Sequence, residues 1–176
     1  MQEFHQGWLS GVQQIESPNV DARPADTQIE LIVLHNISLP PSQYGGRGIE
    51  QLFTNQLDPH EHPYYAQIAH LRVSAHFLIQ RTGEVTQFVS CDQRAWHAGQ
   101  SMWRGRSVCN DFSIGIELEG SDFEPFIPAQ YDVLMQLLQC LCAHYPITAI
   151  TGHSDIAPLR KTDPGPYFGW AHLVEW

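Results

Sequence analysis

The pattern of apolar and polar positions predicts several buried strands and one long amphipathic helix. Residues 29–34 form an apolar run on both faces, which is typical of a central strand in a parallel sheet. Residues 112–118 alternate and predict another strand. Between residues 131 and 145 the apolar positions recur at helical spacing, just after Pro128, a residue that favours the first helical turn. Strands and a helix therefore belong to the same chain.

Shorter segments complete the prediction of an α/β fold. Two β-rich runs, residues 74–80 and 84–89, flank a Gly-containing turn and predict a hairpin. Further expected segments are a Pro- and Gly-rich loop over 39–48, a short helix from Ile49 that ends at Asp58-Pro59, a strand over 147–151 and a helical turn within 168–176. With no repeat or linker, we expect one domain over residues 1–176, a mixed central β-sheet flanked by helices.

The charge balance narrows the class of partner. Nine basic residues against nineteen acidic ones give a net charge of −10 with histidine neutral. A nucleic-acid binder needs a basic face, and an anionic membrane surface attracts basic segments, so neither partner is expected. No apolar run approaches the roughly 20 residues of a membrane span. A small soluble ligand suits this chain better.

The N-terminal residues and the cysteines indicate in which cellular compartment the protein is expected. Residues 1–14 contain no basic cluster followed by an apolar run, so no signal peptide is expected. Cys140 and Cys142 lie two apart in the predicted helix and point to different faces, so they do not suit a disulfide or a metal pair. The cysteine pattern fits a reducing compartment. We therefore expect a cytoplasmic protein, and a monomer.

Two histidines follow predicted strands, and the ends of strands are a common place for a functional site in an α/β sheet. His35 follows the first apolar run, and His153 follows the strand predicted over 147–151. The segment 151–166 also holds Asp163, the only lysine of the chain (Lys161), and three prolines that stiffen the backbone. Zinc accepts imidazole and carboxylate ligands, and a catalytic zinc takes three of them plus water. The alternatives are core histidines bonded to backbone carbonyls and a solvated loop.

Other polar residues suggest further roles. Glu117 and Glu119 lie two apart on one face of a mostly apolar strand, so Glu117 could act as a general base beside a metal, or both could form a solvated acidic edge. His60 and His62 are poorer metal candidates, because two prolines place them in a surface loop. Arginines near a cleft in so acidic a chain suggest an anionic ligand; the candidates are Arg72, Arg94, Arg104 and Arg106.

Several motifs together resemble one known family. They are His35-Asn36, Ser74-Ala75-His76, Arg94-Ala95-Trp96-His97-Ala98-Gly99, the segment NDFSIGIELEG over 110–120 and the segment HSDIAPLRKTDPGP over 153–166. The chain resembles the zinc-dependent N-acetylmuramoyl-L-alanine amidases of type 2, and within them the 1,6-anhydro-N-acetylmuramyl-L-alanine amidases of bacterial cell-wall recycling. The likeness runs from Gly7 to about Trp170.

The resemblance implies a role for each matching residue. It implies a zinc ion (Zn2+) held by His35, His153 and Asp163, with Glu117 as the catalytic carboxylate and Lys161 as the stabiliser of the oxyanion. It also implies that Asn36, Arg72 and Ala95 hold the peptide part of the substrate. One position departs from the family, whose members carry an arginine where this chain has Val108. Arg106 or Arg104 would then have to bind the peptide carboxylate.

The implied activity is hydrolysis of the amide between the lactyl group of N-acetylmuramic acid and L-alanine. The acidic chain favours soluble anhydro-muropeptides over polymeric cell wall. Three alternatives stay open: a peptidoglycan-binding module without zinc, an exported amidase acting on intact wall, and a zinc peptidase that cuts within the peptide stem. The complete set of five implied catalytic and metal-binding residues argues against the first.

Overall fold

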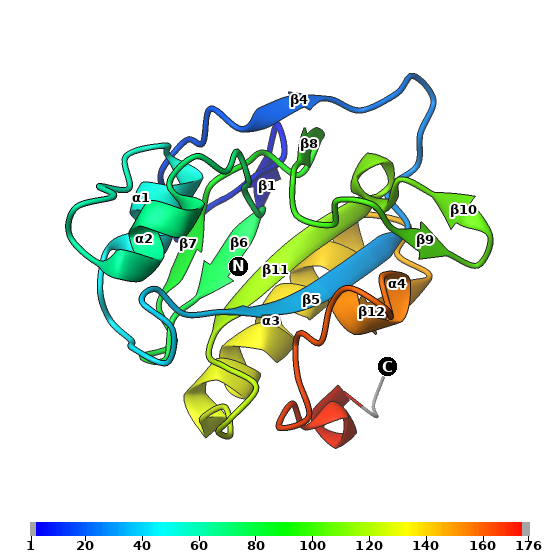
Figure 1. Cartoon of the computed structure of the whole chain (residues 1–176). Coiled ribbons are helices and arrows are strands. Elements are labelled where there is room, and N and C mark those ends of the chain that lie inside the picture. Colours follow the sequence, from blue (N-terminus) through cyan, green and yellow to red (C-terminus); the bar gives the residue numbers. More distant parts are fainter. Residues whose placement is uncertain (1–2, 174–176) are drawn as a thin grey trace.

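A six-stranded mixed sheet forms the centre of the computed structural model, which describes residues 3–173 (Figure 1). Its strand order is β12-β5-β11-β6-β7-β3, and β12, β5, β11 and β6 run parallel to one another. The strands are β3 (Gln13–Gln14), β5 (Leu31–Ile37), β6 (Phe77–Ile79), β7 (Val85–Gln87), β11 (Ser113–Glu119) and β12 (Ala149–Gly152). The predicted fold class is confirmed.

The two longest strands lie side by side in the middle of this sheet. The apolar run predicted as a central strand is β5, which pairs with β12 on one side and β11 on the other. All seven residues of β11 are buried. The alternation of apolar and polar residues along this strand therefore does not mark a solvent-exposed face, because both faces are covered. The alternative of a solvated acidic edge for Glu117 and Glu119 is therefore wrong.

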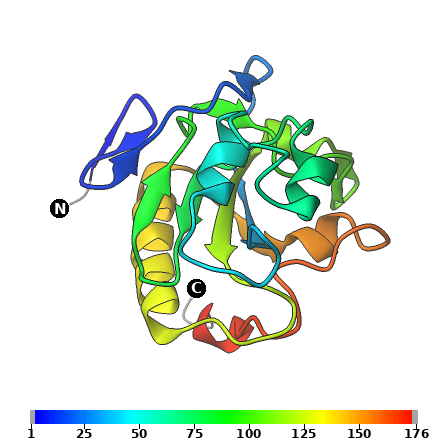
Figure 2. The same ribbon diagram turned by 60° about the vertical axis from the view of Figure 1, so that its left-hand side comes forward.

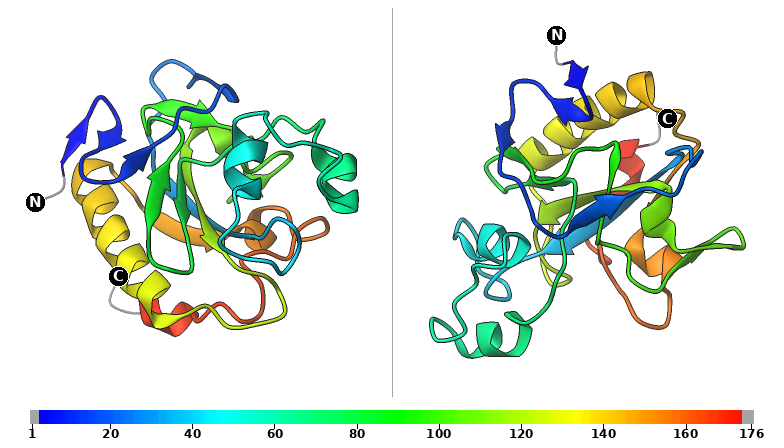
Figure 3. Two further views of the ribbon diagram at one scale, coloured as in Figure 1. Left: turned by 90° about the vertical axis from the view of Figure 1, so that its left-hand side faces the viewer. Right: turned by 90° about the horizontal axis from the view of Figure 1, so that it is seen from above.

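Helix α3 (Pro128–His144) covers one face of the sheet, as Figures 2 and 3 show for the long yellow helix. Its leucines pack against the side chains that β5, β6 and β11 present on that face; the core residues include Ile32, Leu34, Phe77, Ile114, Ile116, Leu118, Leu134, Leu138 and Leu141. Helical spacing of apolar residues requires such a partner surface. The helix predicted from Pro128 onward is confirmed, because Pro128 is its first residue.

Short elements cover the opposite face of the sheet. They are α1 (Gly48–Phe53), α2 (Pro63–Ile68), the 3-10 helix η1 (Cys109–Asp111) and α4 (His153–Ile156). Helix α2 was not predicted, because the prolines around it indicated a loop. Pro63 instead occupies the first helical turn, and the His62 ring accepts a hydrogen bond from the backbone N–H of Tyr64 at 3.0 Å. Helix α1 ends at Phe53, earlier than the expected Asp58.

The remaining predictions have mixed outcomes. The hairpin is confirmed as β6 and β7, which pair antiparallel. Three small antiparallel pairs were not predicted: β1 (Phe4–His5) with β2 (Trp8–Leu9), β4 (Val20–Ala22) with β8 (Gln93–Ala95), and β9 (Met102–Trp103) with β10 (Arg106–Ser107). The final turn is η2 (Trp170–Leu173), and residues 174–176 lie outside the described part. Among residues 3–173, no helix has the length and apolar character of a membrane span.

Candidate active site

The site forms where three parallel strands end on the face opposite α3. In the register of β5 and β11, His35 stands beside Glu117. Gly152 of β12 stands beside Leu34, so the next residue, His153, follows at the level of His35. Ligand sites of α/β sheets lie at these carboxyl ends. His35 belongs to β5 itself rather than to the turn after it, and His153 is the first residue of α4.

Asp163 completes a compact group of three potential metal ligands. A backbone hydrogen bond of 2.9 Å from Ser154 N–H to the Asp163 carbonyl brings the returning loop against α4. The Asp163 Oδ2 atom lies 2.9 Å from His35 Nδ1 and 3.0 Å from His153 Nδ1, and the two Nδ1 atoms are 3.0 Å apart. Within residues 3–173 no other group of three such side chains is close enough to share an ion.

Electrostatics favour the protonation states that metal ligands need. Burial lowers the pKa of His35 to about 4, so its imidazole is neutral and has a lone pair to offer. Burial raises the pKa of Asp163, but the His153 and His35 rings that lie against its carboxylate outweigh this effect and hold that pKa below the usual range. Two imidazole nitrogens and one carboxylate oxygen are a donor set that fits a divalent metal ion.

Glu117 and Lys161 line the same cavity as these three residues. Glu117 is 9% exposed, and its Oε2 atom is buried without a hydrogen-bond partner. Burial and then the charge of Asp163 raise the pKa of Glu117, and Lys161 opposes that shift. A turn fixes the Lys161 backbone, whose N–H donates to Ala157 O at 3.0 Å. No ion pair engages the Lys161 side chain within the described residues.

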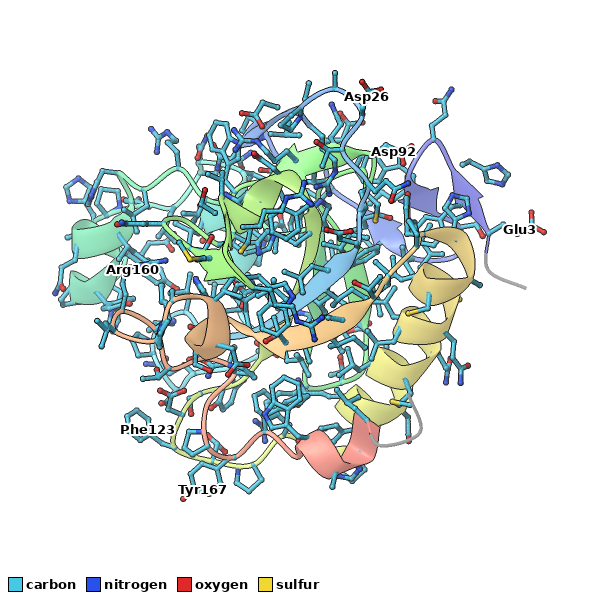
Figure 4. All side chains as sticks on the ribbon, turned by 90° about the vertical axis from the view of Figure 1, so that its right-hand side faces the viewer. Glu3, Asp26, Asp92, Phe123, Arg160 and Tyr167 are labelled. Atoms are coloured by element: carbon cyan, nitrogen blue, oxygen red, sulfur yellow. The ribbon has the colours of Figure 1, made fainter. Side chains whose placement is uncertain are left out.

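The cavity has a volume of about 380 Å³ and two unlike walls. We call the first the metal wall; it consists of His35, Glu117, His153, Lys161 and Asp163. We call the second the helical wall; it consists of apolar side chains of α1, α2 and the segment after α2, namely Leu52, Phe53, Tyr64, Ile68, Leu71 and Val73. Phe123 also lines the cavity but is 81% exposed, and Figure 4 shows it projecting away from the ribbon.

Asn36 lines the cavity but is already engaged in hydrogen bonds. Its side-chain nitrogen donates to Asp122 Oδ1 at 2.7 Å and to the Pro164 carbonyl at 3.0 Å. These bonds join the end of β5 to two loops that border the cavity. Both protons of that nitrogen are used, so a substrate could only donate a hydrogen bond to the Oδ1 atom of Asn36. Substrate binding by Asn36 stays a prediction.

The other predicted substrate-binding residues do not line the cavity. Ala95 is fully buried, and Arg72 is exposed and donates to the carbonyls of residues 69–71. Arg106 pairs with Glu30 at 2.7 Å and lies over the ring of Phe112. Their roles also stay predictions.

Arg94 and the position of the family arginine, which is Val108 here, both lie outside the cavity lining. Arg94 forms ion pairs with Asp21 at 2.6 Å and Asp111 at 3.0 Å, so its charge is neutralised away from the cavity. Val108, which stands at the family arginine position, is 43% exposed and has a φ of 58°. A β-branched residue in this left-handed region is strained.

The structure brings one residue to the site that the sequence did not single out as a candidate. His97 contacts His35, with His35 Nε2 and His97 Nδ1 2.9 Å apart. The two residues are separated by 62 positions, so no local spacing could have revealed the contact. The available signals were the place of His97 in a motif of the family resemblance and in an aromatic–polar stretch over residues 94–99 that could line a groove.

Known proteins with a similar sequence or fold include several amidases. The chain matches the N-acetylmuramoyl-L-alanine amidase family over residues 25–166. It is 57% identical over 169 residues to the 1,6-anhydro-N-acetylmuramyl-L-alanine amidase AmpD of Enterobacter cloacae, across 95% of this chain and 90% of that protein. A crystal structure of a selenomethionine AmpD derivative is 53% identical with a TM-score of 0.95, over 98% of this chain and 97% of that one.

A more distant structure contains a bound substrate. It is the N-acetylmuramyl-L-alanine amidase AmiD from E. coli in complex with the substrate anhydro-N-acetylmuramic acid-L-Ala-D-gamma-Glu-L-Lys. That protein is 30% identical with a TM-score of 0.62, over 99% of this chain and 65% of the AmiD chain.

Proposed function

Because the chain belongs to the N-acetylmuramoyl-L-alanine amidase family, we propose that it is a zinc hydrolase acting on soluble anhydro-muropeptides. The bond cut is the amide between the lactyl carbonyl of 1,6-anhydro-N-acetylmuramic acid and the nitrogen of L-alanine. The observation that carries the proposal is the convergence of His35, His153 and Asp163 beside Glu117 in one cavity.

His35 and His153 would hold zinc through their Nδ1 atoms, and Asp163 through Oδ2. These three atoms are mutually 2.9–3.0 Å apart, and each can present a lone pair to an ion. Three protein ligands are the usual number at a catalytic zinc, where a fourth position stays open. When bound, zinc supplies Lewis acidity, which makes water a nucleophile near neutral pH and polarises a carbonyl.

Glu117 would carry the proton through the reaction. Its unpartnered Oε2 atom can accept a proton from the attacking water, whose oxygen forms a bond to the lactyl carbonyl carbon. The raised pKa of Glu117 favours holding that proton until the C–N bond breaks. The proton then goes to the leaving nitrogen, and the products are a lactyl carboxylate and a peptide with a free L-alanine amine.

Lys161 would stabilise the negative charge that develops on the carbonyl oxygen. It lines the cavity, and no ion pair occupies its ammonium group within the described residues. A positive charge that already lines the cavity can stabilise the oxyanion as it forms.

Several observations support a small substrate and cell-wall recycling in the cytoplasm. A cavity of about 380 Å³ accommodates part of a sugar–peptide, and a net charge of −10 disfavours association with a polyanionic wall. The name of the Enterobacter cloacae relative specifies the 1,6-anhydro sugar, and the AmiD structure contains an anhydro-muropeptide. Cys91 and Cys109 are buried and form no disulfide, as expected of a reducing compartment.

The direct test incubates the zinc-loaded protein with a soluble anhydro-muropeptide and identifies the products by mass. We expect the anhydro sugar and an intact peptide that begins with L-alanine, with little release from intact sacculi. A fragment cut within the stem would indicate a peptidase, and binding without cleavage would indicate a recognition module. Efficient digestion of sacculi would instead favour an amidase of the intact wall. The Glu117→Ala variant is the matched control for each assay.

A further inference from the structure

We propose that His97 is a positioning residue that holds His35 in the tautomer and orientation required for metal binding. We further propose that Asn110 fixes residues 97–98 so that the same segment also orients His153. The inference rests on the proposed function, since it concerns the same metal site. It follows from the hydrogen bonds made by the ring nitrogens that face away from the site.

The outward nitrogen of His153 has an unambiguous partner. His153 Nε2 lies 3.1 Å from the carbonyl oxygen of Ala98, and a carbonyl only accepts. A His153 ring that binds a metal through Nδ1 therefore keeps its proton on Nε2, and its Nδ1 lone pair points to the metal position beside Asp163. Arg160 also donates to the Ala98 carbonyl, at 2.8 Å, from the loop after α4 (Figure 4).

The outward nitrogen of His35 bonds to a side chain instead. For Nδ1 of a neutral His35 ring to bind a metal, the proton must be on Nε2, which then donates to His97 Nδ1 at 2.9 Å. His97 must in turn carry its own proton on Nε2, where Ser113 Oγ lies at 3.1 Å. When His35 is in the metal-binding tautomer, the hydrogen bonds therefore run in one direction, from His35 to His97 and from His97 to Ser113.

The segment that supplies both contacts is itself fixed. Asn110 Oδ1 accepts hydrogen bonds from the backbone N–H of His97 at 3.1 Å and of Ala98 at 2.8 Å. Gly115 of β11 makes room for the ring, because a Cβ there would lie 2.4 Å from His97 Cγ. This close approach accounts for a glycine in the middle of a central strand.

His76, which lies next to His97, is a useful comparison because it contacts none of the potential metal ligands. The ring of His76 accepts from the Gly115 backbone N–H at 3.0 Å, and its Nε2 atom lies 3.1 Å from the Gln93 carbonyl and 3.2 Å from Arg23 Nη2. His97 differs because one of its ring nitrogens contacts a potential metal ligand. Substitution of a residue that hydrogen-bonds to a metal ligand in this way typically lowers metal affinity by about 10–100-fold.

The test compares zinc affinity in two variants of His97 by competition with a chelator. His97→Phe keeps a flat ring without an acceptor, and we expect zinc affinity to fall by about 10–100-fold. His97→Asn keeps an acceptor oxygen near the Nδ1 position and should recover part of that loss. Leu141→Ala, which opens a cavity in the core against α3, is the control for lost stability and should bind zinc like the parent.

A second measurement needs no variant. In the zinc-loaded parent, ¹⁵N imidazole spectra should show the His97 proton on Nε2 and none on Nδ1. A proton on His97 Nδ1, or parental affinity in a folded His97→Phe, would overturn the inference and leave the proposed function intact. A parent protein that binds no zinc would overturn the proposed function itself.

Discussion

The two walls of the cavity are built in opposite ways. The metal wall arises from strands β5 and β11, the start of α4 and the loop after α4, and its histidines are almost fully buried, with His35 1% and His153 3% exposed. The helical wall arises from the short helices α1 and α2 and the segment after α2, and Leu71 on it is 39% exposed. Figure 1 shows α1 and α2 set apart from α4, with the ends of the strands between them.

The difference separates chemistry from recognition. Ligands and proton carriers must be held to within fractions of an ångström. The parallel ladder of β5 and β11 provides this for His35 and Glu117, and the hydrogen bond between Ser154 and Asp163 ties the returning loop to α4. Apolar contacts are less directional, so short helices suffice to contact a substrate. Substitutions in the metal wall should therefore change metal content and turnover, whereas those in the helical wall should change KM.

The largest effect is expected from the metal ligands. His35→Ala, His153→Ala and Asp163→Ala should each reduce bound zinc from about one ion per chain and abolish nearly all turnover, because a catalytic zinc has only three protein ligands. Metal analysis after dialysis against a chelator measures the effect. His60→Ala, in an exposed position away from the cavity, is the control. Full zinc content in all three variants would disprove the ligand assignment.

Glu117→Ala should keep zinc and lose about 10²–10⁴-fold in kcat, because the attacking water then lacks its proton acceptor. Metal analysis and kcat are measured on the same sample. Glu61→Ala is the control, because Glu61 is an exposed carboxylate that does not line the cavity. Near-parental turnover in Glu117→Ala would remove the general base from the mechanism.

Lys161→Ala should keep zinc and lose about 10²–10³-fold in kcat, the usual cost of removing one oxyanion stabiliser. Lys161→Arg should recover only part of that rate, because a planar guanidinium cannot place its charge where a compact ammonium does. Steady-state kinetics of both variants measure this. If Lys161→Arg and Lys161→Ala both keep nearly the parental kcat, Lys161 has no role in catalysis and is only a solvated side chain of its loop.

Leu71→Ala should raise KM by about 5-fold, which corresponds to about 1 kcal/mol of lost apolar contact, with kcat little changed. Leu159→Ala is the matched control, because Leu159 is fully exposed and does not line the cavity. A fall in kcat at constant KM would show that the helical wall takes part in the chemical step, and the distinction between the two walls would fail.

Arg106→Ala should have the smallest effect, a rise in KM of about 2-fold for muropeptides with an intact peptide stem. The guanidinium is shared with Glu30, which limits what it can contribute to a ligand. Substrates with and without the terminal peptide carboxylate separate this contact from general loss of binding. Equal KM values for parent and variant would exclude Arg106 from substrate binding.

Much of the central fold was predictable because its pattern is local. An apolar run of strand length and a helical repeat of apolar residues need no knowledge of distant partners, and both β5 and α3 follow from them. Helix α2 and the small antiparallel pairs were not predictable, because they contain only two to six residues in each element. Packing against the body of the protein, rather than local propensity, decides such short elements.

The sequence by itself determined which residue types were available: a histidine at each of two strand ends, acidic residues in an apolar strand and a single lysine in a stiff loop. Only the tertiary structure decided which of them meet. Parallel pairing sets His35 beside Glu117, and the return of the loop brings Asp163 within 3.0 Å of both histidines. Contacts across 62 to 128 positions depend on strand register and loop closure, which leave no periodic signal along the chain.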